Sequence, residues 1–152
     1  MKDPFMYHKI LAVTFGTDLS IKAVKEAARL AKGLTTKLFV LHVRSPLDVP
    51  HQVEGGILSR VGAEAMADQI DQEERKFLEG VKALTATAGI EAETGYVTDL
   101  TPYKAIIRVA QDQHCDLIVM GTRIRHGIPG FLVKSATQKV LEHTQIPVLV
   151  VR

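Results

Sequence analysis

This chain of 152 residues has little cysteine and little net charge. Cys115 is its only cysteine, which excludes an internal disulfide and a cysteine-rich zinc site. Because Cys115 precedes an apolar run, we expect it to act as a small hydrophobic residue of the core. The formal net charge is only +2, and the sequence has no block of Lys and Arg of the kind that binds phosphate backbones. The composition therefore argues against nucleic acid as a partner.

Long hydrophobic runs are missing as well. No apolar stretch approaches the ~18 residues that cross a bilayer, and residues 1–6 lack the apolar centre of a signal peptide. We therefore expect a cytoplasmic protein with no membrane partner. Hydrophobic residues make up 46% and charged residues 24% of the chain, which is ordinary for a globular protein. The length fits one domain, over residues 1–152, that is large enough to bury a core.

Strand-like apolar runs alternate with amphipathic helical patterns along the sequence. Strands are expected at 8–15, 37–43, 90–97, 116–120 and 147–151. Helices are expected from an N-cap at Asp18 to a stop at Gly33, over 57–87, from Thr101-Pro102, and over 131–143. This alternation predicts an α/β fold, a doubly wound and mainly parallel five-stranded sheet with helices on both faces. We expect the order 3-2-1-4-5, with the polar third strand and the last strand at the edges.

The run from Asp116 to Thr122 carries the strongest functional signal. It is apolar and rich in β-branched residues up to Gly121, as in a strand buried on both faces of a parallel sheet. Two more glycines, Gly127 and Gly130, follow before the next expected helix. In open parallel sheets, ligands bind at this end of the strands, where the strand order reverses. The chain therefore carries the scaffold of a nucleotide site.

Three segments together resemble the universal stress protein family, small α/β domains related to adenine-nucleotide α-hydrolase folds. They are the first strand and turn (10–20), the run 116–122, and the last helix and strand (135–143 and 146–151). The resemblance covers essentially the whole chain. It implies a homodimer, commonly joined by antiparallel pairing of the last strand. It also implies one of two classes, because part of this family binds ATP and part does not.

Members that bind ATP resemble one another in a loop of the form G-x2-G-x9-G-S/T after the fourth strand. Glycines let the backbone approach the phosphates, and N–H groups at the start of the next helix hold the negative charge. Gly121 and Ser135 match the first and last positions of this pattern. Ile124 and Lys134 stand where the second and third glycines would be. The phosphate side of the site therefore departs from the binders.

The nucleoside side departs from the binders too. Phe15 stands where they carry an acidic residue at the end of the first strand, and a phenyl ring cannot accept a hydrogen bond. Leu100 stands near the position of a further glycine, before the third helix. Val43 matches the position that contacts adenine through its backbone. We therefore expect a degraded ATP site and no bound cofactor, with ATP binding as the alternative.

A residual nucleotide or anion site is compatible with these losses. Basic residues Arg123, Arg125, His126 and Lys134 lie near an expected helix start, where the helix dipole favours anions. A solvated basic surface loop is the simpler interpretation of the same charges, and we favour it. The residues assigned to the residual site are Val43, Gly121, Arg123, Gly127, Gly130 and Ser135.

No catalytic or metal-binding constellation is recognisable in the sequence. The six histidines are dispersed, without the i, i+4 spacing of helical metal sites. His42 lies in an apolar run and is expected to be a hydrogen-bonded structural residue, while Asp71, Glu73 and Glu74 are expected to form a solvated helix face. We therefore expect a non-enzymatic stress-response protein. A nucleotide-binding regulatory module with an altered phosphate loop, or an interaction domain for another protein, are the alternatives.

The last strand is the expected dimer contact. An apolar edge strand exposes unpaired N–H and C=O groups, and pairing with its own copy about a two-fold axis satisfies both edges at once. A loop or helix of the same chain covering that edge is the alternative. The residues of the expected contact are Pro147, Val148, Leu149, Val150 and Val151.

Overall fold

Strands and helices alternate along the chain in the computed structural model, which describes residue 3 and residues 6–46, 60–122 and 135–152. The elements are β1 (Lys9–Thr14), α1 (Asp18–Leu34), β2 (Lys37–Arg44), α2 (Arg60–Thr87), β3 (Glu93–Thr98), α3 (Pro102–Asp112), β4 (Leu117–Gly121), α4 (Ala136–His143) and β5 (Val148–Val151).

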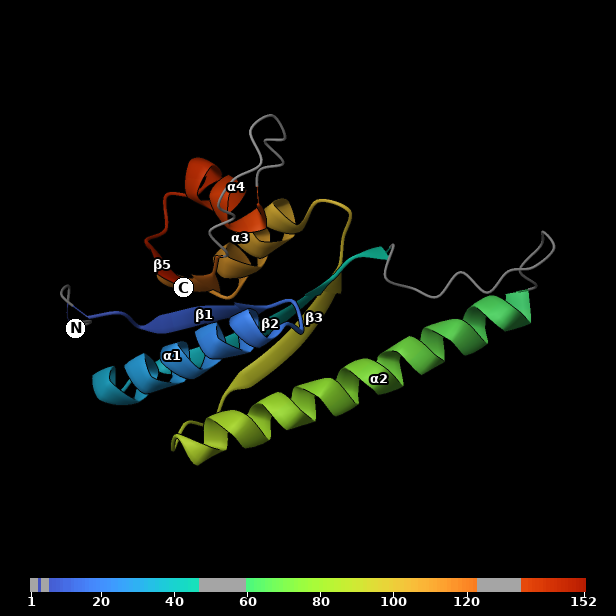
Figure 1. Cartoon of the computed structure of the whole chain (residues 1–152), viewed down its shortest axis with the longest axis horizontal. Helices are drawn as coiled ribbons and strands as arrows, with labels where there is room; N and C mark the ends of the chain where they lie inside the picture. Colours follow the sequence, from blue (N-terminus) through green and yellow to red (C-terminus); the bar gives the residue numbers. More distant parts are fainter. Residues whose placement is uncertain (1–2, 4–5, 47–59, 123–134) are drawn as a thin grey trace.

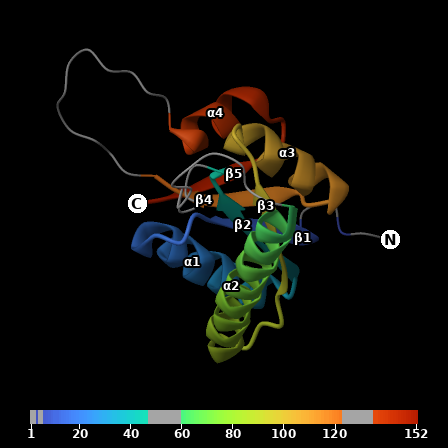
Figure 2. The ribbon, with the colours of Figure 1, turned by 90° about the vertical axis from the view of Figure 1, so that its right-hand side faces the viewer.

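The strands form one five-stranded sheet in the order β3-β2-β1-β4-β5, and every pairing is parallel. Helices α1 and α2 lie on one side of this sheet, and α3 and α4 lie on the other (Figures 1 and 2). The predicted α/β fold and strand order are therefore confirmed. Because β1 and β4 are neighbours whose helices leave on opposite faces, their carboxyl ends meet where the strand order reverses.

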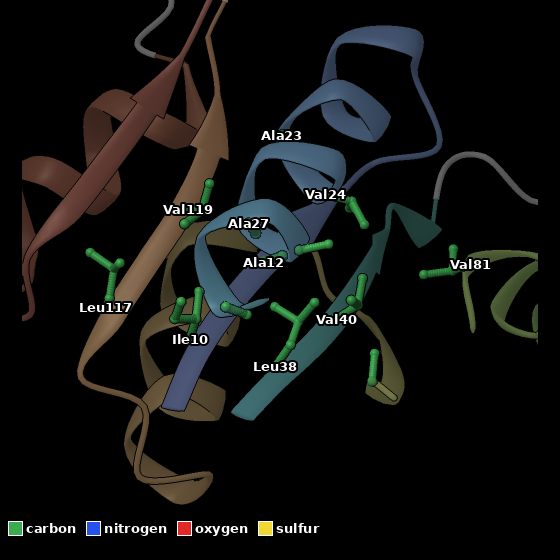
Figure 3. Packing of buried hydrophobic residues seen from close by; sticks show 13 residues of the cluster. Ile10, Ala12, Ala23, Val24, Ala27, Leu38, Val40, Val81, Leu117 and Val119 are labelled. Carbon is green, nitrogen blue, oxygen red and sulfur yellow. The ribbon is translucent and has the colours of Figure 1, made fainter. Parts of the chain in front are cut away.

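The core has two layers that share the central strand β1. Residues Ile10 and Ala12 face α1, whereas Leu11 and Val13 face α3 and α4, as the alternation of side chains along a strand requires. All four are at most 1% exposed, and burying a large aliphatic side chain contributes roughly 1.5–3 kcal/mol. On the α1 side, small alanines such as Ala27 let the helix lie close to the sheet (Figure 3).

The ends of α1 differ from the sequence expectation by one or two residues. Thr17, not Asp18, is the N-cap, and its side chain and that of Ser20 accept each other's backbone N–H in a capping box. Gly33 does not stop the helix, which continues through Leu34. Thr35 adopts the left-handed conformation instead, with φ 53°, and its N–H donates to the carbonyls of the last turn.

Other element boundaries are also shifted. The third strand was expected from Ile90, but β3 begins at Glu93, because Ile90 packs against the core beside α1 and does not join the ladder. Helix α4 begins at Ala136, and the earlier residues predicted for it, 131–134, lie outside the described part of the chain. Thr137 and Val140 form the buried side of α4, and Leu141 is 50% exposed.

Cys115 lies in the core just before β4. Its side chain is 6% exposed, and burial raises the pKa of its thiol to about 11. The predicted role as a small hydrophobic residue is therefore confirmed. Among the described residues, none of the helices is long and apolar enough to cross a membrane.

Asp116 ties the beginnings of β1 and β4 together. Its carboxylate accepts the backbone N–H of His8 at 2.9 Å and of Lys9 at 3.1 Å, and its Oδ2 lies 2.8 Å from His8 Nδ1. Burial alone would raise the pKa of this carboxyl. The hydrogen bonds from Lys9 and His8 outweigh that effect and lower the pKa, since they favour the ionised form.

Replacing Asp116 should weaken the fold in a pH-dependent way. A group whose pKa is lower in the folded state stabilises that state above its unfolded pKa, about 3.9 for Asp, and this stability is lost as the pH falls through the folded pKa. We expect Asp116→Asn to lower the free energy of unfolding by about 1 kcal/mol at pH 7, a low figure because exposure screens the pair. Urea denaturation should show the difference shrinking below about pH 4. Asp112→Asn, at an exposed position, is the control; an equal effect there would contradict the assignment.

Candidate functional site

The turn between β1 and α1 is closed by its own side chains. The Ser20 hydroxyl, 4% exposed, accepts the N–H of Phe15 at 3.1 Å and of Thr17 at 3.0 Å. Thr14 Oγ1 accepts the N–H of Gly16 at 3.0 Å. Gly16 has φ 76°, a left-handed conformation that favours glycine. Three consecutive amides at the carboxyl edge of the sheet therefore have protein acceptors before any ligand arrives.

Phe15 occupies the end of β1 on the face of α3 and α4. Its partly buried ring packs against the core cluster that contains Val13, Val43 and Met120. The side chain of Val43 belongs to that cluster and is only 3% exposed, so only its backbone could meet a ligand. Leu100, by contrast, is 74% exposed. An apolar ring thus lies at the position to which the family resemblance assigns an acidic residue.

Gly121 ends β4 in a place that no larger residue could fill without movement. A Cβ at this position would lie 3.0 Å from Leu19 Cγ and 3.1 Å from the Leu19 carbonyl oxygen. Thr137 Oγ1 of α4 donates to the Gly121 carbonyl at 2.8 Å, and Thr122 N–H donates to the Val151 carbonyl at 2.9 Å. Gly121 is therefore needed where α1, α4 and β5 converge, whatever the site binds.

Ser135 is the N-cap of α4. Its Oγ accepts the N–H of Gln138 at 3.1 Å, so the hydroxyl already has a structural partner. Because Thr137 of the same helix bonds Gly121, the start of α4 lies beside the end of β4. The other residues assigned to the site, together with the remaining basic and glycine-replacing positions, fall in the segment 123–134, outside the described residues: Arg123, Ile124, Arg125, His126, Gly127, Gly130 and Lys134.

A buried ionic cluster lies under the β1–α1 turn. His42 Nδ1 lies 2.6 Å from Glu74 Oε2, and Arg44 Nη1 donates to Glu74 Oε1 at 3.0 Å. The ring of Phe77 lies 4.2 Å from that of His42, centroid to centroid. A Cβ on Gly16 would lie 3.5 Å from His42 Nε2. The prediction that His42 is a hydrogen-bonded structural residue is confirmed.

The prediction that Asp71, Glu73 and Glu74 form a solvated face of α2 is wrong for Glu74, and for Asp71 it misses a hydrogen bond. Glu74 is 3% exposed, and its burial is tolerated because two cationic or donor groups neutralise and hydrogen-bond it. Asp71 accepts a hydrogen bond from the hydroxyl of Tyr96 in β3. Only Glu73, 54% exposed, fits the expectation. The sequence does contain a signal: Glu74 lies three and four residues before Phe77 and Leu78, on the helix side that meets the sheet.

Metal ligands do not gather in this region. In the part of the chain that the structure describes, no group of three or more His, Cys, Asp and Glu side chains could hold a metal ion. The carboxyl edge instead offers backbone groups, hydroxyls that are already bonded, and an apolar ring. These groups are suited to hydrogen bonds and apolar contacts with an organic ligand.

The fold and this edge define a class of protein: a small doubly wound α/β domain with a glycine-ended β4 at the switch point. The model of the universal stress protein family matches residues 6–152, and the chain belongs to that family. Universal stress protein YxiE from Bacillus subtilis is 32% identical over 149 residues, which cover 97% of this chain and 100% of YxiE.

Solved structures agree on the fold. The structure of MJ0577 from Methanocaldococcus jannaschii has a TM-score of 0.71 at 23% identity and covers 96% of both chains. A universal stress protein crystallised in complex with cAMP has a TM-score of 0.68 at 22% identity, and covers 96% of this chain and 97% of its own. At these identities the likeness describes the architecture alone.

Adding one methyl group at Gly121 should test its packing role. We expect Gly121→Ala to lower the free energy of unfolding by roughly 1–3 kcal/mol, because the new Cβ would press on Leu19. Gly33→Ala is the control: no heavy atom lies within 4 Å of its added Cβ, and alanine in a helix should stabilise by up to about 1 kcal/mol. Chemical denaturation measures both. A neutral Gly121→Ala would show that α1 and β4 need no close contact.

Proposed function

We propose that this chain is a cytoplasmic, non-enzymatic stress-response protein that acts as a homodimer and does not bind ATP in the way of the family's binders. The observation that carries this proposal is the place of Phe15. Its ring packs into the core at the end of β1, where the resemblance assigns an acidic side chain to the nucleoside contact. A ligand hydroxyl that met the ring would lose a hydrogen bond, which costs about 1–3 kcal/mol.

The phosphate side supports the same conclusion. Gly121 and Ser135 are the two residues that match the binders' loop, and each has a structural task in this chain. Their presence is therefore explained by packing against Leu19 and by capping α4, without a phosphate. Ile124 and Lys134 replace the other two glycines, and a side chain at such positions keeps backbone N–H groups away from a phosphate.

A nucleotide-binding regulatory module is the second candidate function. A protein of the same fold was solved with cAMP, and a monophosphate needs fewer contacts from the altered loop than a triphosphate does. Val43 keeps the position whose backbone meets adenine, and Arg123 with Gly127 and Gly130 would supply the anion contacts. This candidate predicts binding of adenine monophosphates without binding of ATP.

Calorimetric titration separates these candidates. We expect no Mg-ATP binding in the low micromolar range, which corresponds to about −8 kcal/mol. Restoring the loop with Ile124→Gly and Lys134→Gly should not restore binding, because Phe15 still fills the nucleoside side. The same pair with Phe15→Asp should bind more tightly than the pair alone. Strong binding by the loop variant would show that Phe15 is no obstacle, and binding of cAMP by the unaltered chain would favour the second candidate.

The homodimer proposal rests on β5. Within the described residues this strand pairs with β4 on one side only. Leu149 is 41% exposed, and its neighbours Val148, Val150 and Val151 are only partly buried. Pro147, which has no N–H to donate, stands just before the strand, where it does not interrupt a ladder. An apolar edge of this kind is suited to antiparallel pairing with a second copy.

A charge on the edge should disrupt that pairing. We expect Leu149→Lys to reduce the mass in sedimentation at tens of micromolar to about half, because a buried unpaired ammonium at the strand contact is costly. Hydrogen exchange at the β5 amides should become faster in the variant. Leu100→Lys, at a position 74% exposed, is the matched control and should change neither quantity. An unchanged mass for Leu149→Lys would contradict pairing through β5.

A further inference from the structure

Helix α2 has a row of mostly apolar residues next to the side that it buries against the sheet. The buried side consists of Glu74, Leu78, Val81 and Thr85. A second row, which we name the α2 seam, follows steps of four, three, four, three and four residues, the spacing of a coiled-coil contact. Its members are Met66, Ile70, Glu73, Phe77, Gly80 and Leu84. None of the six is fully buried by the described part of the chain.

The two halves of the α2 seam have different surroundings. The C-terminal half lines a groove of about 470 Å³ with Ile21 of α1, and Glu73, Phe77, Gly80 and Leu84 are among its residues. Apart from the adjacent backbone of α2, no heavy atom of the described residues lies within 4 Å of a Cβ added to Gly80, so the groove is open there. Met66 and Ile70 come from the N-terminal half of the helix, and the N-terminal end of α2 extends past the end of the sheet (Figure 1).

We propose that the α2 seam pairs antiparallel with the same seam of a second copy, about a two-fold axis near residue 75. The spacing is symmetric about that point: Met66 then faces the partner's Leu84, and Ile70 faces the partner's Gly80. The projecting half of each helix enters the open groove of the other copy, and Ile70 fills the space left above glycine. Such a contact is isologous, because one surface serves both copies.

Charge along α2 selects the antiparallel direction. In its first half, Arg60 stands against five acidic residues: Glu64, Asp68, Asp71, Glu73 and Glu74. The second half holds Arg75, Lys76 and Lys82 against Glu79 alone. Glu74 is neutralised within its own chain, but the asymmetry persists without it. Antiparallel pairing places the acidic half beside the basic half, whereas parallel pairing would place like charges together.

Opposite charges also face each other at the centre of the proposed contact. Exposed Glu73 and Lys76 both line the groove. In the antiparallel register, Glu73 lies within one residue of the level of the partner's Lys76, which is about 1.5 Å along the axis. Symmetry supplies the same pair a second time. The α2 seam and the β5 edge are separate surfaces. Homodimers formed through β5 would therefore associate further through the seam, into assemblies larger than a dimer.

Engineered disulfides test the register directly. Ile70 and Gly80 are ten residues apart on one helix, about 15 Å, too far for a disulfide within one copy. Between copies they face each other. Mild oxidation of the double variant Ile70→Cys/Gly80→Cys should convert most of the protein to a covalent dimer. Ile70→Cys alone and Gly80→Cys alone are the matched controls and should not cross-link, because equal positions also lie about 15 Å apart.

The native thiol does not confuse this measurement, since Cys115 is buried. If another protein, another part of the chain or only water occupies the groove, the double variant will form no more covalent dimer than the single variants, and the proposal is overturned. The same double variant carrying Leu149→Lys should still cross-link. That result separates failure of the seam from failure of the β5 pairing.

A second arm uses Gly80 in the otherwise unaltered chain. Both Gly80→Arg and Gly80→Ala should favour the helix over glycine, and none of the described residues outside this stretch of α2 comes within 4 Å of a Cβ there. Arginine would place a long cation where Ile70 enters, so the sedimentation mass should fall to about half. Alanine leaves room for Ile70, so the mass should stay that of the unaltered protein. Equal masses for the two variants would overturn the proposal.

Discussion

The burial of β1 on both faces is the constraint on which the remaining structure depends. Ile10 to Val13 have almost no exposed surface, so β1 needs a strand on each side and a layer of helices on each face. Strands β2 and β4 pair with its two edges. Helix α1 covers one face, and helices α3 and α4 cover the other. The crossovers then bring the carboxyl ends of β1 and β4 together. The candidate site is therefore a consequence of how the core is covered.

Structural and ligand-binding roles compete for the same residues at this edge. Ser20 satisfies the amides of the first turn, Ser135 caps α4, and Gly121 lets α1 approach β4. A sequence under selection for folding alone would keep all three. Phe15, Ile124 and Lys134 stand at positions where the family resemblance assigns other residues to members that bind ATP. Motif residues thus carry information about ligands only where packing does not already require them.

Sequence patterns predicted the elements that depend on local periodicity. The continuous apolar run of β4 and the alternation of helical and strand patterns predicted the doubly wound α/β fold. The same alternation is compatible with more than one strand order, so periodicity alone does not select β3-β2-β1-β4-β5. Helix ends were less predictable. Thr35, and not Gly33, adopts the left-handed conformation at the end of α1, where its N–H donates to carbonyls of the last turn. The burial of Glu74 depends on Arg44 and His42 of a distant strand, which periodicity cannot show. The assignments within 123–134 stay predictions.

The surroundings of Cys115 determine how this protein can respond to oxidants. Peroxides react with the thiolate, and burial raises the pKa of Cys115 to about 11, so the thiol stays protonated at neutral pH. The side chain is also 6% exposed, so an oxidant would first need the strand end to open. Sulfenic acid formation or glutathione attachment would therefore report unfolding and not redox potential.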